Sequence, residues 1–404
     1  MSLMTEGAGK LGSLAFADAA DALGASLDAS AGLDSMSVDL SALKENLAPS
    51  LALYRDLLRE PRFEQGEIDR VKASWIAGIQ QEKVNPGAVA MRVLPPLLYG
   101  KGHPYAIPFT GSGTEASIAS LTRDDLVAFH RDWLQPERAR LVVTGATTLA
   151  EIVPLLEQRF GDWKSAPGAP AVRAVPAVAR PNASRVFLVD QPGAIQSNIY
   201  VSQVVAPTGD ASTIDFDFAN GVLGGEFSSR LNMNLREDKS WAYGSYSNAT
   251  NTLGQRPWIA SAAVQSDKTA ESAAELRREI TAFTGGTRAI TADEVAKIRA
   301  SNTRSLPGAF ETASAVLGQV SSNLRYGRPD DYIVRYQARN EAMTPALAQA
   351  AARAIDPKAL TWVIVGDLAK IEQPVRALDL GTVQVIDADG RPAAPKSASA
   401  ASGK

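Results

Sequence analysis

Apolar side chains at helical spacing mark two segments early in the chain. The first segment carries Leu47, Leu51, Tyr54 and Leu58. The second carries Ile68, Val71, Trp75 and Ile79. Because residues three or four positions apart lie on one face of an α-helix, both segments predict helices with one buried face.

Denser apolar runs farther along the chain predict strands. They cover residues 185–189, 198–205 and 257–264, and a Gln191-Pro-Gly193 turn separates the first two. Two further runs, 139–144 and 360–365, each follow a predicted helix and precede a glycine and another helix. This mixture predicts an α+β fold, in which each mostly antiparallel sheet is covered by helices on one face.

The two halves of the chain resemble each other. Four segment pairs match in the same order, at separations of 221 to 227 positions. They are residues 67–74 with 294–301, 99–101 with 326–328, 136–145 with 357–366, and Thr122 with Thr344. Collinear matches at nearly one separation indicate an internal duplication, and hence two homologous domains.

The duplication sets the expected domain boundaries. We expect a first domain over 1–164, a proline-rich linker over 165–183, a second domain over 184–385 and a disordered tail over 386–404. Aligning Gly7 with Gly224 or Gly225 leaves residues 185–221, which include predicted strands, without a counterpart in the first half. We therefore expect the first domain to be truncated at its N-terminus.

Composition narrows the possible functions. The formal net charge of −3 provides no basic field for nucleic acid. The chain has no cysteine, which excludes disulfides and thiolate chemistry. No apolar run reaches the roughly 20 residues that span a bilayer, so no membrane insertion is expected. The first ten residues lack a signal-peptide pattern, and between bacterial compartments we favour the periplasm over the cytoplasm.

Few residues of this chain could support catalysis without a partner protein. The chain has two histidines, His103 and His130, and neither has a carboxylate at the helical spacing of a metal motif. We expect His103 to be a turn residue fixed by the proline that follows it, and His130 to lie on a helix surface. No Gly-x-Ser-x-Gly elbow is present, and the glycine-rich stretch at 110–114 lacks the lysine of a phosphate loop.

The most suggestive stretch runs from Leu223 to Gly244. Two glycines would permit a tight turn into a helix, on which Phe227, Leu231 and Leu235 would form a buried stripe. Arg230 and Arg236 then lie off that stripe, and Tyr243 follows the helix end. On the residues alone, a surface helix with solvated arginines and a packed tyrosine competes with a functional Arg236/Tyr243 pair.

The same stretch resembles the C-terminal domain signature of the pitrilysin/insulinase family of zinc metallopeptidases. The resemblance rests on the order Leu-Gly-Gly-x-Phe-Ser-Ser-Arg-Leu, then Leu-Arg-Glu, then Ala-Tyr. The first half agrees at 103–105, 121–126, 133–136 and 160–163. The family implies paired α+β domains around a peptide chamber. Its two-subunit members divide a His-x-x-Glu-His zinc site and an Arg/Tyr pair between subunits.

The resemblance assigns roles to residues of this chain. Arg236 and Tyr243 match the substrate-binding pair. The last zinc histidine would fall at Ser2 and the distal glutamate at Gly78, and neither residue is a metal ligand of this kind of site. We therefore expect no catalytic residue and no metal in this chain, with the zinc in a homologous partner subunit and a peptide as substrate.

Two other functions stay open. A structural subunit of a larger assembly would co-purify with that assembly, whereas an autonomous peptidase would contain zinc and cut peptides alone. The retained Arg/Tyr pattern favours the non-catalytic subunit of a two-subunit peptidase over both.

Overall fold

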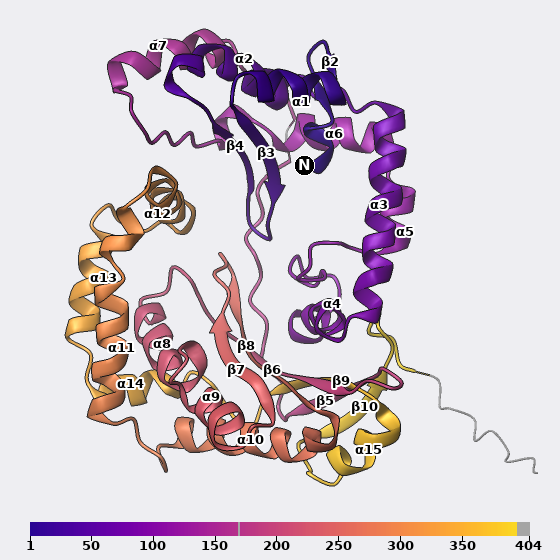
Figure 1. The fold of residues 1–404 in the computed structure, drawn as a ribbon, viewed down its shortest axis with the longest axis vertical. Coiled ribbons are helices and arrows are strands. Elements are labelled where there is room, and N and C mark those ends of the chain that lie inside the picture. Colours follow the sequence, from indigo (N-terminus) through magenta and orange to yellow (C-terminus); the bar gives the residue numbers. More distant parts are fainter. Residues whose placement is uncertain (169, 394–404) are drawn as a thin grey trace, which may run out of the picture. The chain divides into compact units, whose positions relative to one another are not determined.

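The computed structural model describes residues 1–168 and 170–393 (Figure 1). The chain forms two compact units, and each unit takes segments from both halves of the sequence. Unit 1 comprises residues 1–80, 111–174 and 306–329. Unit 2 comprises residues 81–110, 175–305 and 330–404. The expected boundaries at 164 and 184 stay a prediction.

Unit 2 is built on one six-stranded sheet, in the order β10-β5-β9-β6-β8-β7. Its strands are β5 (Arg185–Asp190), β6 (Gln196–Pro207), β7 (Ala242–Ala249), β8 (Gln255–Gln265), β9 (Thr361–Gly366) and β10 (Thr382–Ile386). β5 pairs in parallel with β9 and β10, and the other three pairings are antiparallel. The apolar runs thus form strands as predicted, in a mostly antiparallel sheet.

Helices cover both faces of this sheet rather than one. The unit 2 helices are α4 (Pro86–Tyr99), α8 (Thr213–Asn220), α9 (Arg230–Asn232), α10 (Thr269–Gly285), α11 (Ala292–Arg304), α13 (Tyr332–Glu341), α14 (Pro345–Ala352) and α15 (Leu368–Arg376). Val186, Leu188 and Trp362 join a large core with α8, α10 and α14. On the opposite face, Val363 and Val365 pack with α4, and Figure 1 shows α4 and α10 on opposite sides of the sheet. The expectation of one covered face is wrong because both faces of the inner strands are apolar.

Unit 1 is mainly helical. Its helices are α1 (Ser13–Ala22), α2 (Leu47–Arg59), α5 (Glu115–Ser120), α6 (Arg123–Trp133), α7 (Leu149–Phe160) and α12 (Ala313–Tyr326), with the first part of α3 (Gln65–Val84). Its strands form two hairpins, β1 (Gly7–Ala8) with β2 (Leu11–Gly12) and β3 (Ser26–Ala31) with β4 (Met36–Ser41). The helical spacings correctly predicted α2 and α3.

The strand expected at 139–144 is not formed. Its counterpart β9 lies between β5 and β6 and takes all of its backbone pairing from them. Residues 185–221, which contain β5 and β6, have no counterpart in the first half. A central strand without neighbours has no ladder to join, so the apolar run alone does not produce a strand. In the described part of unit 1, the strands form only the two antiparallel hairpins β1–β2 and β3–β4.

The duplication extends to an exchange of helices between the units. α4 and α12 begin 227 positions apart, at Pro86 and Ala313, and end 227 positions apart, at Tyr99 and Tyr326. α4 lies in the first half of the sequence but belongs to unit 2, whereas α12 lies in the second half but belongs to unit 1. Each helix thus belongs to the unit that is built mainly from the opposite half of the sequence.

The segment after β10 is ordered up to Ala393. Asp389 accepts a hydrogen bond from Lys83 at 3.0 Å, and Asp387 accepts one from the backbone N–H of Arg391 at 2.9 Å. The predicted tail is therefore structured over residues 387–393, and its remainder lies outside the described residues. Within those residues, no helix is long and apolar enough to cross a membrane.

Candidate substrate-binding site

The glycine pair at 224–225 lies in a π-helix at Gly221–Gly225 rather than in a tight turn. A Cβ on Gly224 would stand 2.5 Å from the backbone nitrogen of Ser247 in β7, so only glycine allows this close approach. A second π-helix, Met233–Asp238, follows α9 directly. The stretch expected to be one regular helix is thus a short α-helical turn between two π segments.

This irregular helix changes which side chains are buried. Leu231 and Leu235 lie in the core as expected, but Phe227 is 54% exposed. Phe227 precedes the first residue of α9, so a four-residue helical spacing does not carry its side chain to the buried face. The predicted buried stripe is therefore wrong at Phe227.

A tight reversal joins the second π-helix to β7. Ser240 adopts a left-handed conformation, with φ of 55°. The backbone N–H of Trp241 donates to the carbonyl of Leu235 at 2.9 Å, and that of Ser240 donates to the carbonyl of Arg236 at 3.0 Å. These two bonds span six and four residues, one more each than in a Schellman motif, and they close a left-handed reversal at the end of the π-helix. The reversal turns the chain back, so that Tyr243 returns alongside Arg236.

A β-bulge then directs Tyr243 outward. The pairing of β7 with β8 shifts register between Ala242 and Ser245, and Ser245 and Ser247 are buried. Without the shift, Tyr243 would share the buried face of Ser245, because side chains alternate along a strand. Instead, Tyr243 is 87% exposed. The packed tyrosine that competed with the functional interpretation is therefore not observed.

Arg236 contacts two aromatic rings. Its guanidinium carbon lies 4.8 Å from the centroid of Phe227 and 5.2 Å from that of Tyr243. Both distances are within the range of cation–π attraction. The structure thus brings the two predicted residues together and adds Phe227, which the motif contained but the helical spacing assigned to the core. We call these three residues the Arg236 cluster.

A buried asparagine holds the backbone around this cluster. Asn232 donates from its side-chain amide to the carbonyl of Phe227 at 2.7 Å, and its Oδ1 accepts from the backbone N–H of Ser245 at 3.2 Å. Asn232 is fully buried, so both bonds form away from water. It therefore ties the loop that carries Phe227 to the strand that carries Tyr243, a role that the sequence pattern did not reveal.

Arg230 is a structural residue rather than a solvated one. Its side chain is buried, donates to the Glu294 carboxylate at 2.7 and 2.8 Å, and donates to the carbonyls of Arg288 and Ala289. Burial acts to raise the pKa of Glu294, but the hydrogen bonds from Arg230 and Thr291 outweigh it and the pKa is lowered. The expectation of two solvated arginines is therefore wrong for Arg230.

The two histidines make structural contacts. The His103 ring stacks on Tyr99 at 4.9 Å, and its Nε2 lies 2.9 Å from the carbonyl oxygen of Pro176. His130 is half-buried rather than on the surface, and its Nε2 lies 2.8 Å from the carbonyl oxygen of Leu58. Burial lowers the pKa of the His130 imidazole. Both side chains thus fix backbone segments within their own units.

The positions assigned to lost zinc ligands lie in ordinary helical structure. Ser2 begins a 3₁₀ turn, and Gly78 lies within α3 with open space where a side chain would stand. Over the described part of the chain, no three His, Asp or Glu side chains are grouped so that they could hold a metal ion.

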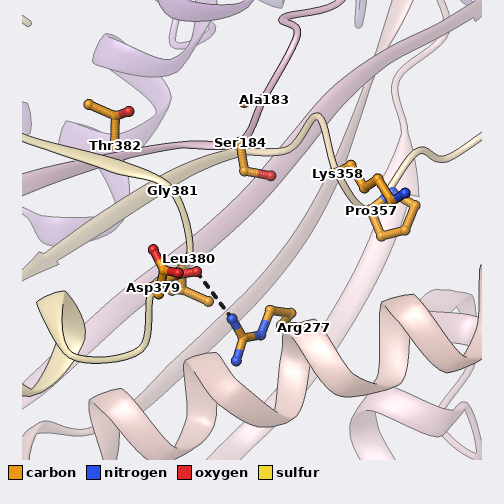
Figure 2. A pocket seen from close by; sticks show the side chains of 9 residues that line it. All are labelled: Ala183, Ser184, Arg277, Pro357, Lys358, Asp379, Leu380, Gly381 and Thr382. Carbon is orange, nitrogen blue, oxygen red and sulfur yellow. Dashed lines mark hydrogen bonds between the residues drawn. The ribbon is translucent and has the colours of Figure 1, made fainter.

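A surface cavity of about 520 Å³ lies elsewhere in unit 2 (Figure 2). Arg277 borders it but donates to the carbonyls of Leu378 and Asp379, at 2.9 and 3.3 Å. None of its lining residues belongs to the Arg236 cluster. The cavity is therefore separate from the candidate site.

Comparisons with known proteins relate this arrangement to a family. The sequence profile described as the peptidase M16 inactive domain matches residues 120–302, which include the whole Arg236 cluster. The uncharacterized zinc protease YmxG of Bacillus subtilis (strain 168) is 25% identical over 205 residues, covering 51% of this chain and 48% of that protein. The Helicobacter pylori protein named non-peptidase homolog YmxG is 25% identical over 124 residues, 31% of this chain and 28% of that protein. The chain thus spans half or less of the length of these relatives.

A solved structure shares the fold. The peptidase M16 inactive domain from Pseudomonas fluorescens superposes with a TM-score of 0.82 at 23% identity, covering 90% of this chain and 86% of that one. The profile match and the shared fold support the resemblance found in the sequence. Residues 120–302 are thus similar to the domain that the family description calls the peptidase M16 inactive domain.

Proposed function

We propose that this chain is the non-catalytic subunit of a heteromeric zinc metalloendopeptidase. It binds peptide substrate through Arg236 and Tyr243 and completes the active site of a homologous partner that carries His-x-x-Glu-His. The zinc, held by that partner, would activate water for attack on the peptide carbonyl. The Arg236 cluster is the observation that carries the proposal.

The environment of Arg236 suits peptide recognition. Contacts with the rings of Phe227 and Tyr243 restrict the guanidinium. Its N–H groups lie in the plane of the guanidinium and can donate to a peptide carbonyl or carboxylate. Its ion pair with Glu237, at 3.3 Å, joins side chains that are each about one-third exposed. Such a pair is worth about 1 kcal/mol or less, so a substrate group can replace Glu237.

The exposure of Tyr243 also supports a binding role. Because the fold leaves the Tyr243 side chain exposed, its ring can pack against a substrate backbone and its O–H can donate a hydrogen bond. In a closed chamber, that donor could reach the oxygen on which negative charge develops during cleavage. Asn232 and the reversal at Ser240 fix the backbone on both sides of Tyr243 beforehand, which lowers the cost of ordering this segment on binding.

Substitutions in the Arg236 cluster test the proposal. With the chain co-purified with a homologous His-x-x-Glu-His protein of the same genome, Arg236→Ala should lower kcat/KM for peptide cleavage about 10- to 100-fold, the range for losing charge-assisted hydrogen bonds. Tyr243→Phe should lower it about 5-fold, the effect of one neutral hydrogen bond.

Matched controls separate this role from general damage. Arg335→Ala removes an exposed arginine of α13, and Tyr246→Phe alters another exposed tyrosine of β7. Both should leave cleavage unchanged. The assigned roles are wrong if the Arg236 and Tyr243 variants cleave as well as these controls, and co-purification with a larger assembly that cuts no peptide would favour a structural subunit.

A further inference from the structure

The surface cavity of unit 2 lies where three parallel strands begin. The first residues of β10, β5 and β9 stand side by side, with Thr382 opposite Arg185 and Arg185 opposite Thr361. The cavity of about 520 Å³ is lined by residues at or shortly before the starts of these strands and by Arg277 of α10 (Figure 2). This volume is in the range of small-molecule sites, so the cavity can hold a small organic molecule.

Close contacts hold the backbone on one side of this cavity. Gly381 has a φ of 145°, and a Cβ there would stand 2.1 Å from the carbonyl oxygen of Ser184, so only glycine fits. The backbone N–H of Leu360 donates to Oγ of Ser184 at 3.1 Å. Because this bond uses a lone pair of the oxygen, the hydroxyl hydrogen of Ser184 is left to donate. The wall is thus fixed, and a residue that lines it retains an O–H donor.

Two cationic side chains, Arg277 and Lys358, line the cavity, and neither forms an ion pair within the part of the chain that the structure describes. Nη1 of Arg277 donates to the carbonyls of Leu378 and Asp379, which holds the guanidinium at the loop after α15 (Figure 2). Its Nε and Nη2 take no part in these bonds. Asp379 is the one acidic residue in the lining. Two cations against one anion leave the cavity with an excess of positive charge.

We propose that this cavity binds a small organic molecule through its phosphate group. The phosphate oxygens accept hydrogen bonds from Nε or Nη2 of Arg277, from Nζ of Lys358 and from the hydroxyl of Ser184. These donors come from three separate elements, namely α10, the segment before β9 and the segment before β5. A tetrahedral phosphate offers acceptors to donors from several directions, whereas the acceptors of a carboxylate lie in one plane. The donor set therefore suits a phosphate better than a carboxylate.

Other ligand classes fit the cavity less well. A metal ion would find a single carboxylate, and the described residues hold no group of His, Asp and Glu side chains suited to one. An apolar molecule would remove water from charged and hydroxyl side chains without replacing its hydrogen bonds. These side chains are Ser184, Arg277, Lys358, Asp379 and Thr382. The proposal is independent of the Arg236 cluster, none of whose residues lines the cavity.

Ligand-detected NMR titration of the full-length chain at low ionic strength tests this site. Glycerol phosphate should bind with a Kd of about 1 mM or less, and glycerate, its carboxylate analogue, at least about 10-fold more weakly. Arg277→Ala and Lys358→Ala should each weaken glycerol phosphate binding about 10-fold, because each removes a charge-assisted hydrogen bond. Lys358 is exposed, so its variant tests the charge without disturbing the fold. Arg353→Ala and Lys370→Ala, which remove exposed cations of unit 2 outside the cavity, should leave the affinity unchanged.

A variant with the opposite expected effect makes the outcome specific for an anion. Asp379 has a left-handed φ of 51°, which asparagine also adopts, so Asp379→Asn should retain the fold. Removal of this negative charge should strengthen glycerol phosphate binding about 2- to 5-fold, the size of an exposed charge–charge interaction. The proposal fails if glycerol phosphate does not bind at about 10 mM. It also fails if glycerate binds as tightly, or if Lys358→Ala and Arg277→Ala both leave the affinity unchanged.

Discussion

Replacing Trp258 by alanine is expected to lower the free energy of unfolding of unit 2 by about 3–5 kcal/mol, the usual cost of truncating a buried tryptophan. Trp258 lies in β8 and is fully buried in the large core beneath the sheet. Its indole N–H donates to Oδ1 of Asn220 at 2.8 Å, and Asn220 in turn donates to the carbonyl of Ser247. The substitution thus opens a cavity and unbalances a buried hydrogen-bond network.

Chemical denaturation followed by hydrogen exchange in β6 and β8 measures this loss for unit 2 separately. Trp258→Phe should cost less, about 1–3 kcal/mol, because it keeps most of the apolar volume and removes mainly the donor to Asn220. Ile195→Ala, at a position that is largely exposed, should stay within about 0.5 kcal/mol of the wild type. A loss below about 1 kcal/mol for Trp258→Ala would contradict the core described above.

Replacing Glu294 by glutamine is expected to lower stability at neutral pH by about 3 kcal/mol. The change removes the carboxylate that neutralises Arg230, whose side chain stays buried. Loss of one partner of a buried ion pair costs several kcal/mol, because the remaining charge has no compensation. The amide keeps the volume of the carboxylate, so the effect reports the charge rather than packing.

The same pair predicts a dependence on pH. The folded-state pKa of Glu294 lies below its ordinary value of 4.5, so its contribution is fully present above that value and is lost as the pH falls through the folded-state pKa. The stability difference between wild type and Glu294→Gln should therefore be largest at pH 6–7 and shrink in acid, as denaturation at several pH values would measure. A difference that is constant down to pH 2 would exclude the ion pair as its cause.

The elements predicted best are those whose patterns depend on local geometry. Helical spacing identified α2 and α3, and dense apolar runs identified β5, β6 and β8. The predicted face of α3 is buried at Ile68 and Ile79, whereas Trp75 on the same face is 37% exposed. Segment 139–144 has an equally apolar pattern but no neighbouring strands. A strand depends on residues distant in sequence, so a run can match β9 and still form none.

The candidate site was predictable only in part. The family motif indicated Arg236 and Tyr243, and the structure brings them together with Phe227, whose ring Arg236 also contacts. Phe227 was misassigned because the spacing assumed a regular helix, whereas π segments flank α9. Nothing in the sequence distinguishes Asn232 from other polar helix residues, because its role follows from a loop and a strand that meet only in the fold.

The most direct test of the central proposal measures zinc and peptide cleavage for this chain, for its His-x-x-Glu-His partner, and for their mixture. The proposal predicts that the purified chain binds no stoichiometric zinc and cuts no peptide. It also predicts that the partner holds the zinc and that cleavage rises sharply when the two proteins are mixed, saturating at equal amounts. Cleavage by this chain alone with bound zinc, or cleavage by the partner that the chain does not change, would contradict the account.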